Sequence, residues 1–240
     1  MKGMKGSRKS GRALRMETLE RRELMAGDVA VNLAGGTLNI VGSAERDTVH
    51  ISESGGVTRI LAGGRTTTVP NNYSSIKVDL GGEKDALNIY LPRMRNLQNV
   101  NVNMGSGIAE DADINIGQVR SLSVNSVAAQ GVDIKLIGKV VDQAILDFGS
   151  DNITDKLFLD YADINRAVVR MGGGNDSFSM KYSTIRNADI QLGSGNDVAV
   201  IYSTSEILGG VLDGGTGSED AYRRSGARMS RVLIRGFERS

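Results

Sequence analysis

Residues 168–201 read VVRMGGGNDSFSMKYSTIRNADIQLGSGNDVAVI, and this stretch decides the fold. It holds two copies of one unit, in which an alternating apolar segment precedes a Gly-x-Gly-Asn-Asp turn and a second alternating segment follows it. Alternation of apolar and polar residues is typical of a β-strand with one buried face. Gly172 and Gly193 open the two turns 21 residues apart, and Gly214 follows after another 21. A fixed period of this length indicates a repeat architecture.

The same unit recurs toward the N-terminus with looser spacing. Turns at Gly81, Gly105 and Gly149 are each flanked by short apolar alternations, and Gly81 precedes Gly105 by 24 residues. Gly105 and Gly149 are 44 residues apart, which leaves room for two units. The middle unit has only Gln130-Gly131 where the glycine-rich turn is expected.

Stacking is a physical requirement for such units. One unit cannot bury its inner apolar face alone, whereas units stacked ~4.8 Å apart align the Ile, Val, Leu and Met side chains of successive units in continuous columns. At ~3.3 Å per residue, two short strands and their turns fit one rung of a parallel β-helix. The sequence therefore predicts an all-β chain that forms a right-handed parallel β-helix (β-solenoid) over residues 73–240.

The two regions before residue 73 differ from the repeats. Residues 29–72 contain the closely spaced turns Ser54-Gly55-Gly56 and Gly63-Gly64, which predict an antiparallel β cap over the open N-terminal edge of the solenoid. Residues 1–28 carry six basic residues and no acid before Glu17. They predict a basic, disordered sorting segment with one short helix over residues 18–25.

The composition excludes several classes of function. The chain has 29 basic and 28 acidic residues, no cysteine, and one histidine, His50. Without cysteine, disulfides, thiolate metal sites and Cys nucleophiles are excluded, and Ser-His-Asp catalysis would depend on His50 alone. No apolar run approaches ~18 residues, so no membrane span is predicted. Aromatic residues make up 4% of the chain and offer no stacking platform for nucleic acid. We predict no catalytic residues and no enzyme activity.

Two of the turns suggest a binding chemistry. Residues 171–179 read MGGGNDSFS and residues 192–200 read LGSGNDVAV. Both resemble the hemolysin-type (RTX) calcium-binding nonapeptide G-G-x-G-x-D-x-U-x. The resemblance implies a Ca²⁺ site between successive rungs, because calcium takes six to eight oxygen ligands at ~2.3–2.6 Å, which two stacked turns can supply. The implied metal site consists of the carboxylate ligands Asp176 and Asp197 and the turn residues Gly174, Gly195, Asn175 and Asn196.

The other turns depart from that pattern. Asp220 comes one place late after its glycines, Asp85 is one residue early, and Asp111 follows a longer turn. A structural alternative needs no ion: the glycines supply positive φ, and Asn175 and Asn196 stack as an amide ladder.

The N-terminal segment carries a second resemblance. Residues 19–28, LERRELMAGD, resemble the LEPR-type N-terminal segment of large exported or surface proteins of bacteria, with Arg21 where that family usually has proline. The resemblance implies export to an extracellular or cell-surface location. We therefore predict an exported or cell-surface β-solenoid with a structural or adhesive role, with calcium ions and cell-surface or matrix components as partners.

Two alternatives to this function stay open. One is a carbohydrate-active parallel β-helix of the lyase or hydrolase kind, which requires a deep groove with three or more convergent charged side chains. The other is an ion-free structural solenoid.

Overall fold

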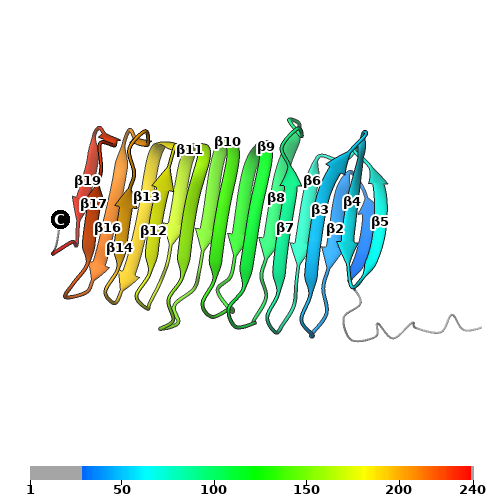
Figure 1. Cartoon of the computed structure of the whole chain (residues 1–240), viewed down its shortest axis with the longest axis horizontal. Helices are drawn as coiled ribbons and strands as arrows, with labels where there is room; N and C mark the ends of the chain where they lie inside the picture. Colours follow the sequence, from blue (N-terminus) through cyan, green and yellow to red (C-terminus); the bar gives the residue numbers. More distant parts are fainter. Residues whose placement is uncertain (1–28, 239–240) are drawn as a thin grey trace, which may run out of the picture.

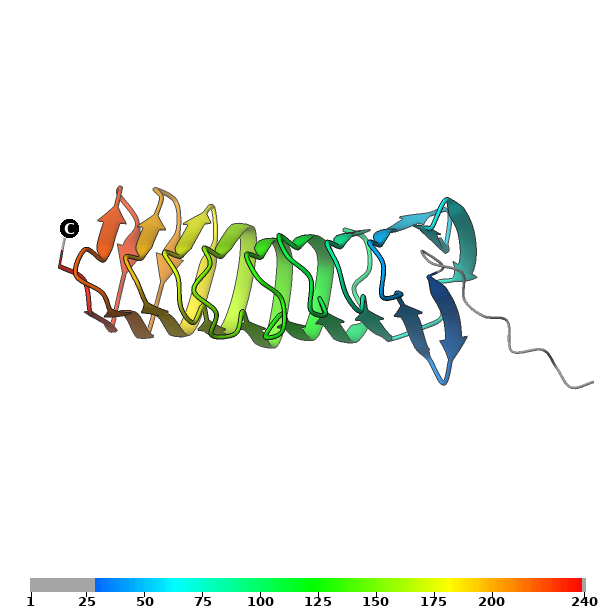
Figure 2. The same cartoon turned by 90° about the horizontal axis from the view of Figure 1, so that it is seen from below.

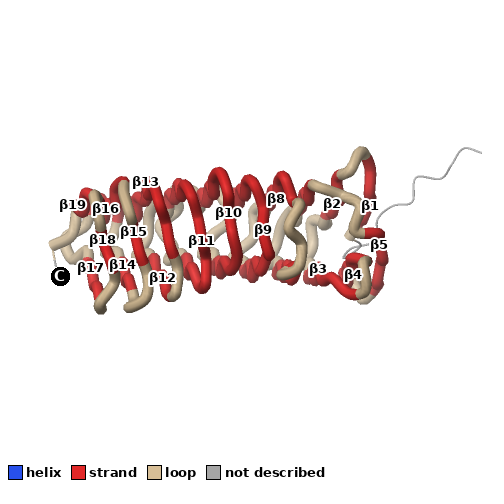
Figure 3. Tube along the Cα trace, turned by 90° about the horizontal axis from the view of Figure 1, so that it is seen from above, coloured by secondary structure: helices blue, strands red, loops and turns tan. Residues whose placement is uncertain are grey.

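The chain forms a long stack of β-strand coils (Figures 1 and 3). The computed structural model describes residues 29–238, and that part of the chain contains strands and turns but no helix. Residues 29–238 include no helix that is long and apolar enough to cross a membrane. Residues 1–28, including the helix predicted over residues 18–25, lie outside the described residues.

Each coil contributes strands to two facing parallel sheets. The first sheet contains β2 (Thr37–Val41), β6 (Ser75–Asp79), β8 (Leu97–Asn103), the second halves of β9 (Asp111–Asn125), β10 (Asp133–Asp147) and β11 (Lys156–Arg170), β13 (Thr184–Ser194), β16 (Gly210–Thr216) and β19 (Val232–Arg235). The second sheet contains β3 (Thr48–Ser54), β7 (Ala86–Leu91), the first halves of β9 to β11, β12 (Ser177–Lys181), β14 (Val198–Ile201) and β17 (Ala221–Arg224). The short strands β15 (Glu206–Ile207) and β18 (Arg228–Met229) continue the bend between the sheets. The predicted parallel β-solenoid is confirmed.

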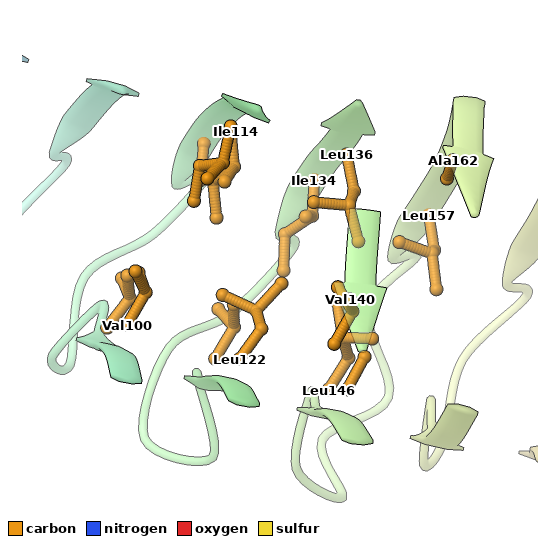
Figure 4. Close-up of a cluster of buried hydrophobic side chains, with 14 of the residues drawn as sticks. Val100, Ile114, Leu122, Ile134, Leu136, Val140, Leu146, Leu157 and Ala162 are labelled. Atoms are coloured by element: carbon orange, nitrogen blue, oxygen red, sulfur yellow. The ribbon is translucent and has the colours of Figure 1, made fainter. Parts of the chain in front are cut away.

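The core consists of aliphatic columns that run along the stack. In the first sheet, one register position is occupied by Ile40, Val78, Val102, Val124, Leu146, Val169, Ile190 and Leu212, and each of these side chains is at most 2% exposed. Side chains of the second sheet, such as Ile114 and Leu136, point toward this column from the other wall (Figure 4). The inward half of every alternation is therefore buried by the coils before and after it, as stacking requires.

Antiparallel strands close the N-terminal end of the stack (Figure 2). β1 (Ala30–Ala34) forms a hairpin with β2, and β3, β4 (Val57–Ala62) and β5 (Arg65–Pro70) form an antiparallel meander. The first coil nevertheless begins inside the region predicted as cap, because β2 and β3 pair in parallel with β6 and β7. The strands β4 and β5 are inserted between this coil and the next, so the regular spacing of the coils cannot be recognised in this part of the sequence.

Candidate functional site

Asp176 and Asp197 stand at the same position of successive coils, directly before β12 and β14. Their side chains are 1% and 0% exposed, although both follow surface turns. Gly195 lets the turns stack this closely: it has a φ of +130°, and a Cβ built on it would stand 1.6 Å from the carbonyl oxygen of Gly174. Only glycine fits such a position without displacing the neighbouring turn.

These two aspartates belong to a longer column of buried acids. The strand register aligns an acid at this position in nearly every coil, and each is at most 2% exposed. We call this column the acidic ladder; it consists of Asp47, Asp85, Glu110, Asp155, Asp176, Asp197 and Asp220.

Hydrogen bonds link the ladder from coil to coil. The backbone N–H of Asp155 donates to Oδ1 of Asp176 over 2.8 Å, that of Asp176 donates to Oδ1 of Asp197 over 2.8 Å, and that of Asp197 donates to Oδ1 of Asp220 over 2.7 Å. The same pattern joins Asp47 to Asp85 and Asp85 to Glu110 near the N-terminal end. Each acid after Asp47 therefore satisfies a buried N–H of the preceding coil, which would be destabilising if left unpaired.

Valine interrupts the ladder once. Val132 occupies the ladder position between Glu110 and Asp155, in the coil whose glycine turn is the weakest in the sequence. Its N–H donates to Oδ1 of Asp155 over 2.6 Å, but its side chain cannot accept the N–H of Glu110. The ladder is therefore divided into a segment of three acids and a segment of four.

The second oxygen of most ladder acids is buried without a partner. Within residues 29–238 no hydrogen-bond donor reaches these atoms, which are Asp47 Oδ1, Asp85 Oδ2, Glu110 Oε1, Asp176 Oδ2, Asp197 Oδ2 and Asp220 Oδ2. A buried carboxylate oxygen of this kind is unfavourable unless a proton or a cation neutralises the group.

Burial accordingly raises the pKa values of most ladder acids. Burial is the largest cause for Asp85, Glu110, Asp155, Asp176 and Asp197; neighbouring acids raise these pKa values further, and the N–H donor lowers them. The pKa is raised to about 8 for Asp176, to about 7 for Asp85, Glu110 and Asp155, and to about 6 for Asp197. These five acids therefore change charge within the physiological pH range.

The two asparagines of the predicted site lie on the exposed side of the same turns. The N–H of Asn196 donates to Oδ1 of Asn175 over 2.8 Å, and the N–H of Ser218 donates to Oδ1 of Asn196 over 3.4 Å. The asparagines thus stack along the axis, as the structural alternative expects. Their oxygens accept backbone N–H groups rather than facing the ladder acids.

The predicted calcium site can be compared with this geometry. Asp176 and Asp197 lie one coil apart, but Oδ1 of Asp197 accepts the N–H of Asp176, so only the second oxygens are free to bind an ion. Among the described residues no group of three or more His, Cys, Asp or Glu side chains could hold a metal ion by itself. Calcium binding would therefore depend on backbone carbonyls of the turns as well, and it stays a prediction.

Five ladder acids were missed in the sequence. Distance from the glycines argues against Asp85 and Asp220 and points to Asp111 in place of Glu110, and the turn pattern gives no signal for Asp47 or Asp155. A better signal is the strand that follows: each ladder acid stands two residues before the first inward residue of the second sheet, as in Asp155-Lys156-Leu157. Counting from the strand finds the acid even where the turn is longer.

A second region of interest lies on the outer face of the second sheet. A depression of about 370 Å³ beside the Val132 interruption has five charged residues in its wall: Lys84, Glu110, Asp111, Asp133 and Lys156. A smaller one of about 130 Å³ follows it, where Asp111 and Asp113 lie near His50. Burial, and then the nearby Asp113 and Asp133, raise the pKa of Asp111.

Comparisons with protein-family models, with curated proteins and with solved structures found no match to this chain.

Proposed function

We propose that this protein is an exported or cell-surface structural module, with a role in building or attaching to a surface matrix. The observation that carries the proposal is the continuous aliphatic core, which joins the coils into one elongated body without a break. A body of this kind presents long, regular outer faces, and the hydrogen bonds between its parallel strands run along its axis. The resemblance of residues 19–28 to LEPR-type segments supports export.

Calcium is the proposed counter-ion of this module. The support is chemical: the second oxygens of Asp176 and Asp197 are buried without a donor, and hard carboxylate and carbonyl oxygens are the ligands that calcium prefers. Gly174 and Gly195 bring successive turns together there, and Asn175 and Asn196 hold the turns in register.

Thermal melting with and without calcium tests this part of the proposal. At about 100 times the dissociation constant, one site adds about 2.7 kcal/mol to the free energy of unfolding. We expect the melting temperature at pH 8 to rise in millimolar calcium, and the rise to shrink in Asp176→Asn and Asp197→Asn. Magnesium serves as the control, because it demands a smaller, more regular site. An unchanged melting temperature in calcium would refute the ion and leave an ion-free structural solenoid.

Adhesion requires its own test. The full chain, immobilised on a surface, is exposed to cell envelopes and to purified matrix polysaccharides, with a soluble all-β protein as the control. Retention that a wash with unlabelled chain displaces would support an adhesive role, and retention no higher than the control would contradict it.

A carbohydrate-active solenoid is the second candidate. It is favoured by the charged side chains around the depressions on the second sheet, where Asp111, Asp113 and Asp133 lie on adjacent strands beside Lys156 and His50. Paired carboxyl groups with different pKa values are the chemistry that glycoside hydrolysis needs. Release of reducing ends or unsaturated products from acidic polysaccharides, abolished in Asp111→Asn, would favour this candidate over the structural one.

A further inference from the structure

We infer that Glu110 is held as a neutral carboxylic acid in the folded solenoid, with its proton on Oε1 donated to the carbonyl oxygen of Glu83. Glu110 would then act as a proton-dependent latch between two successive glycine turns. The inference goes beyond the proposed structural role and does not depend on calcium.

The geometry at Gly107 carries the inference. A Cβ built on Gly107 would stand 1.4 Å from the carbonyl oxygen of Glu83 and 1.7 Å from Oε1 of Glu110. Because both oxygens are this close to one point, they lie at most about 3.1 Å from each other. Both atoms are acceptors when the carboxyl group is ionised, and two acceptors at hydrogen-bond distance require a proton between them.

The other oxygen of the same carboxyl group fixes which one carries the proton. Oε2 of Glu110 accepts the N–H of Asp85 over 2.9 Å. Oε1 is fully buried, and no donor within residues 29–238 reaches it. A protonated Oε1 would donate to Glu83 and thereby satisfy the one oxygen that has no partner. Glu83 itself has a φ of +63°, an uncommon conformation outside glycine, which this hydrogen bond would help to hold.

The charges around Glu110 do not replace the proton. Its neighbours on the preceding turn are Glu83, Lys84 and Asp85, and Asp111 adjoins it on its own strand. On the following coil, Val132 brings no charge to the ladder position. From β10 and β11, Asp133 and Lys156 reach the same depression, where they form an ion pair of 2.9 Å with each other. The negative charge of Asp85 opposes ionisation of Glu110, and the positive charge of Lys84 favours it. No Lys or Arg among the described residues forms an ion pair with Glu110. Burial remains the dominant influence and raises its pKa to about 7.

The consequence is a latch that opens as the pH rises. Loss of the proton would leave a negative oxygen against a carbonyl oxygen in a buried site, where repulsion is weakly screened. The turns before β7 and before β9 would then separate at this point. On the other side of Glu110, the interruption at Val132 leaves the N–H of Glu110 without a carboxylate from the next coil.

A carboxyl titration by NMR tests the inference directly. In the full chain with ¹³C-labelled glutamate side chains, kept free of divalent ions by EDTA, Glu110→Gln identifies the resonance of Glu110 by its loss. We expect that resonance to titrate with a pKa of about 7, about two or more pH units above the ordinary value of an exposed glutamate. Titration of Glu110 at that ordinary value would overturn the inference.

Melting of two glutamine variants provides the second readout. Glutamine keeps the shape of a protonated glutamate, since its amide nitrogen can donate to Glu83 while its oxygen accepts the N–H of Asp85. We expect Glu110→Gln to melt near the wild type at pH 5 and above it at pH 8.5, while Glu45→Gln follows the wild type at both. A Glu110→Gln variant that melts below the wild type at both pH values would refute the latch. If the variant fails to fold, the wild-type titration still decides without that assignment, because a spectrum in which no glutamate resonance titrates near pH 7 would refute the latch.

The same experiment separates the proton from a metal ion. If calcium, rather than a proton, joined the two oxygens, calcium would lower the pH at which the Glu110 resonance titrates, and the calcium-dependent rise in melting temperature would vanish in Glu110→Gln. That outcome would overturn the latch and place the calcium ion at Glu110 rather than at Asp176 and Asp197. A raised titration of Glu110 with no effect of calcium on melting would support the latch and refute the calcium proposal.

Discussion

The substitution Gly195→Ala tests whether close stacking of the glycine turns holds the solenoid together. The new Cβ would stand 1.6 Å from the carbonyl oxygen and 2.6 Å from the carbonyl carbon of Gly174. Both atoms are backbone, so no side-chain rotation can relieve the clash, and one turn must move by more than 1 Å to restore ordinary contact. That movement would also lengthen the 2.8 Å hydrogen bond from the N–H of Asp176 to Oδ1 of Asp197.

The magnitude follows from these separate effects. A φ of +130° is strained for alanine by about 1–3 kcal/mol, overpacking costs about 1–3 kcal/mol, and a weakened buried hydrogen bond costs about 1 kcal/mol. We therefore expect a loss on the order of 4 kcal/mol in the free energy of unfolding. Gly55→Ala is the matched control, because Gly55 has a φ of +62° with nothing within 4 Å of the built Cβ, and it should lose about 1 kcal/mol.

Chemical denaturation followed by far-UV circular dichroism measures both variants. The midpoint and slope of the transition give the free energy of unfolding in each case. If Gly195→Ala loses no more stability than Gly55→Ala, the turns are not in the close contact described above. The reasoning about the ladder beneath them would then fail as well.

Three further predictions follow from the ladder and the core. Asp176 has a pKa raised to about 8 when folded, so its proton stabilises the fold at low pH and this contribution is lost as the pH rises toward 8. In EDTA, the wild type should therefore lose stability between pH 5 and pH 9, and Asp176→Asn should flatten that slope; a wild type that gains stability with pH would contradict the sign. Val132→Asp extends the ladder across its interruption. The difference in melting temperature between this variant and the wild type should favour the variant more at pH 5 than at pH 8.5. Equal differences at the two pH values would show that the new acid does not share the environment of the ladder. Leu146→Ala should cost about 2–5 kcal/mol, because Leu146 is 1% exposed within the core column; its neighbour Ile145 is 40% exposed, and an equal loss in Ile145→Ala would refute the assignment of inward and outward faces.

The coil repeat could be predicted from the sequence because it is a local pattern. The 21-residue spacing of Gly172, Gly193 and Gly214, together with apolar alternation on both sides, leaves few architectures other than a stack of parallel coils. The N-terminal region was harder, since the first coil is split by the inserted β4 and β5. Its partners are therefore more distant in sequence than one period.

The candidate site could be predicted only in part. Asp176 and Asp197 stood out because their turns match a known pattern residue by residue, whereas Glu110 and Asp155 follow turns of different length. Turn length varies without consequence as long as the following strand returns to register, so distance from the glycine is a poor guide to which acid points inward. The strand register, not the turn, places the acid.

By itself, the sequence determined that the chain winds into stacked parallel coils, because alternation and glycine spacing are encoded within each unit. Only the tertiary structure decided that seven acids form one buried column and that Val132 interrupts it. The physical reason is that a carboxyl group acquires its partner from the neighbouring coil, more than 20 residues away. Neither the burial of its second oxygen nor its raised pKa exists until the coils are stacked.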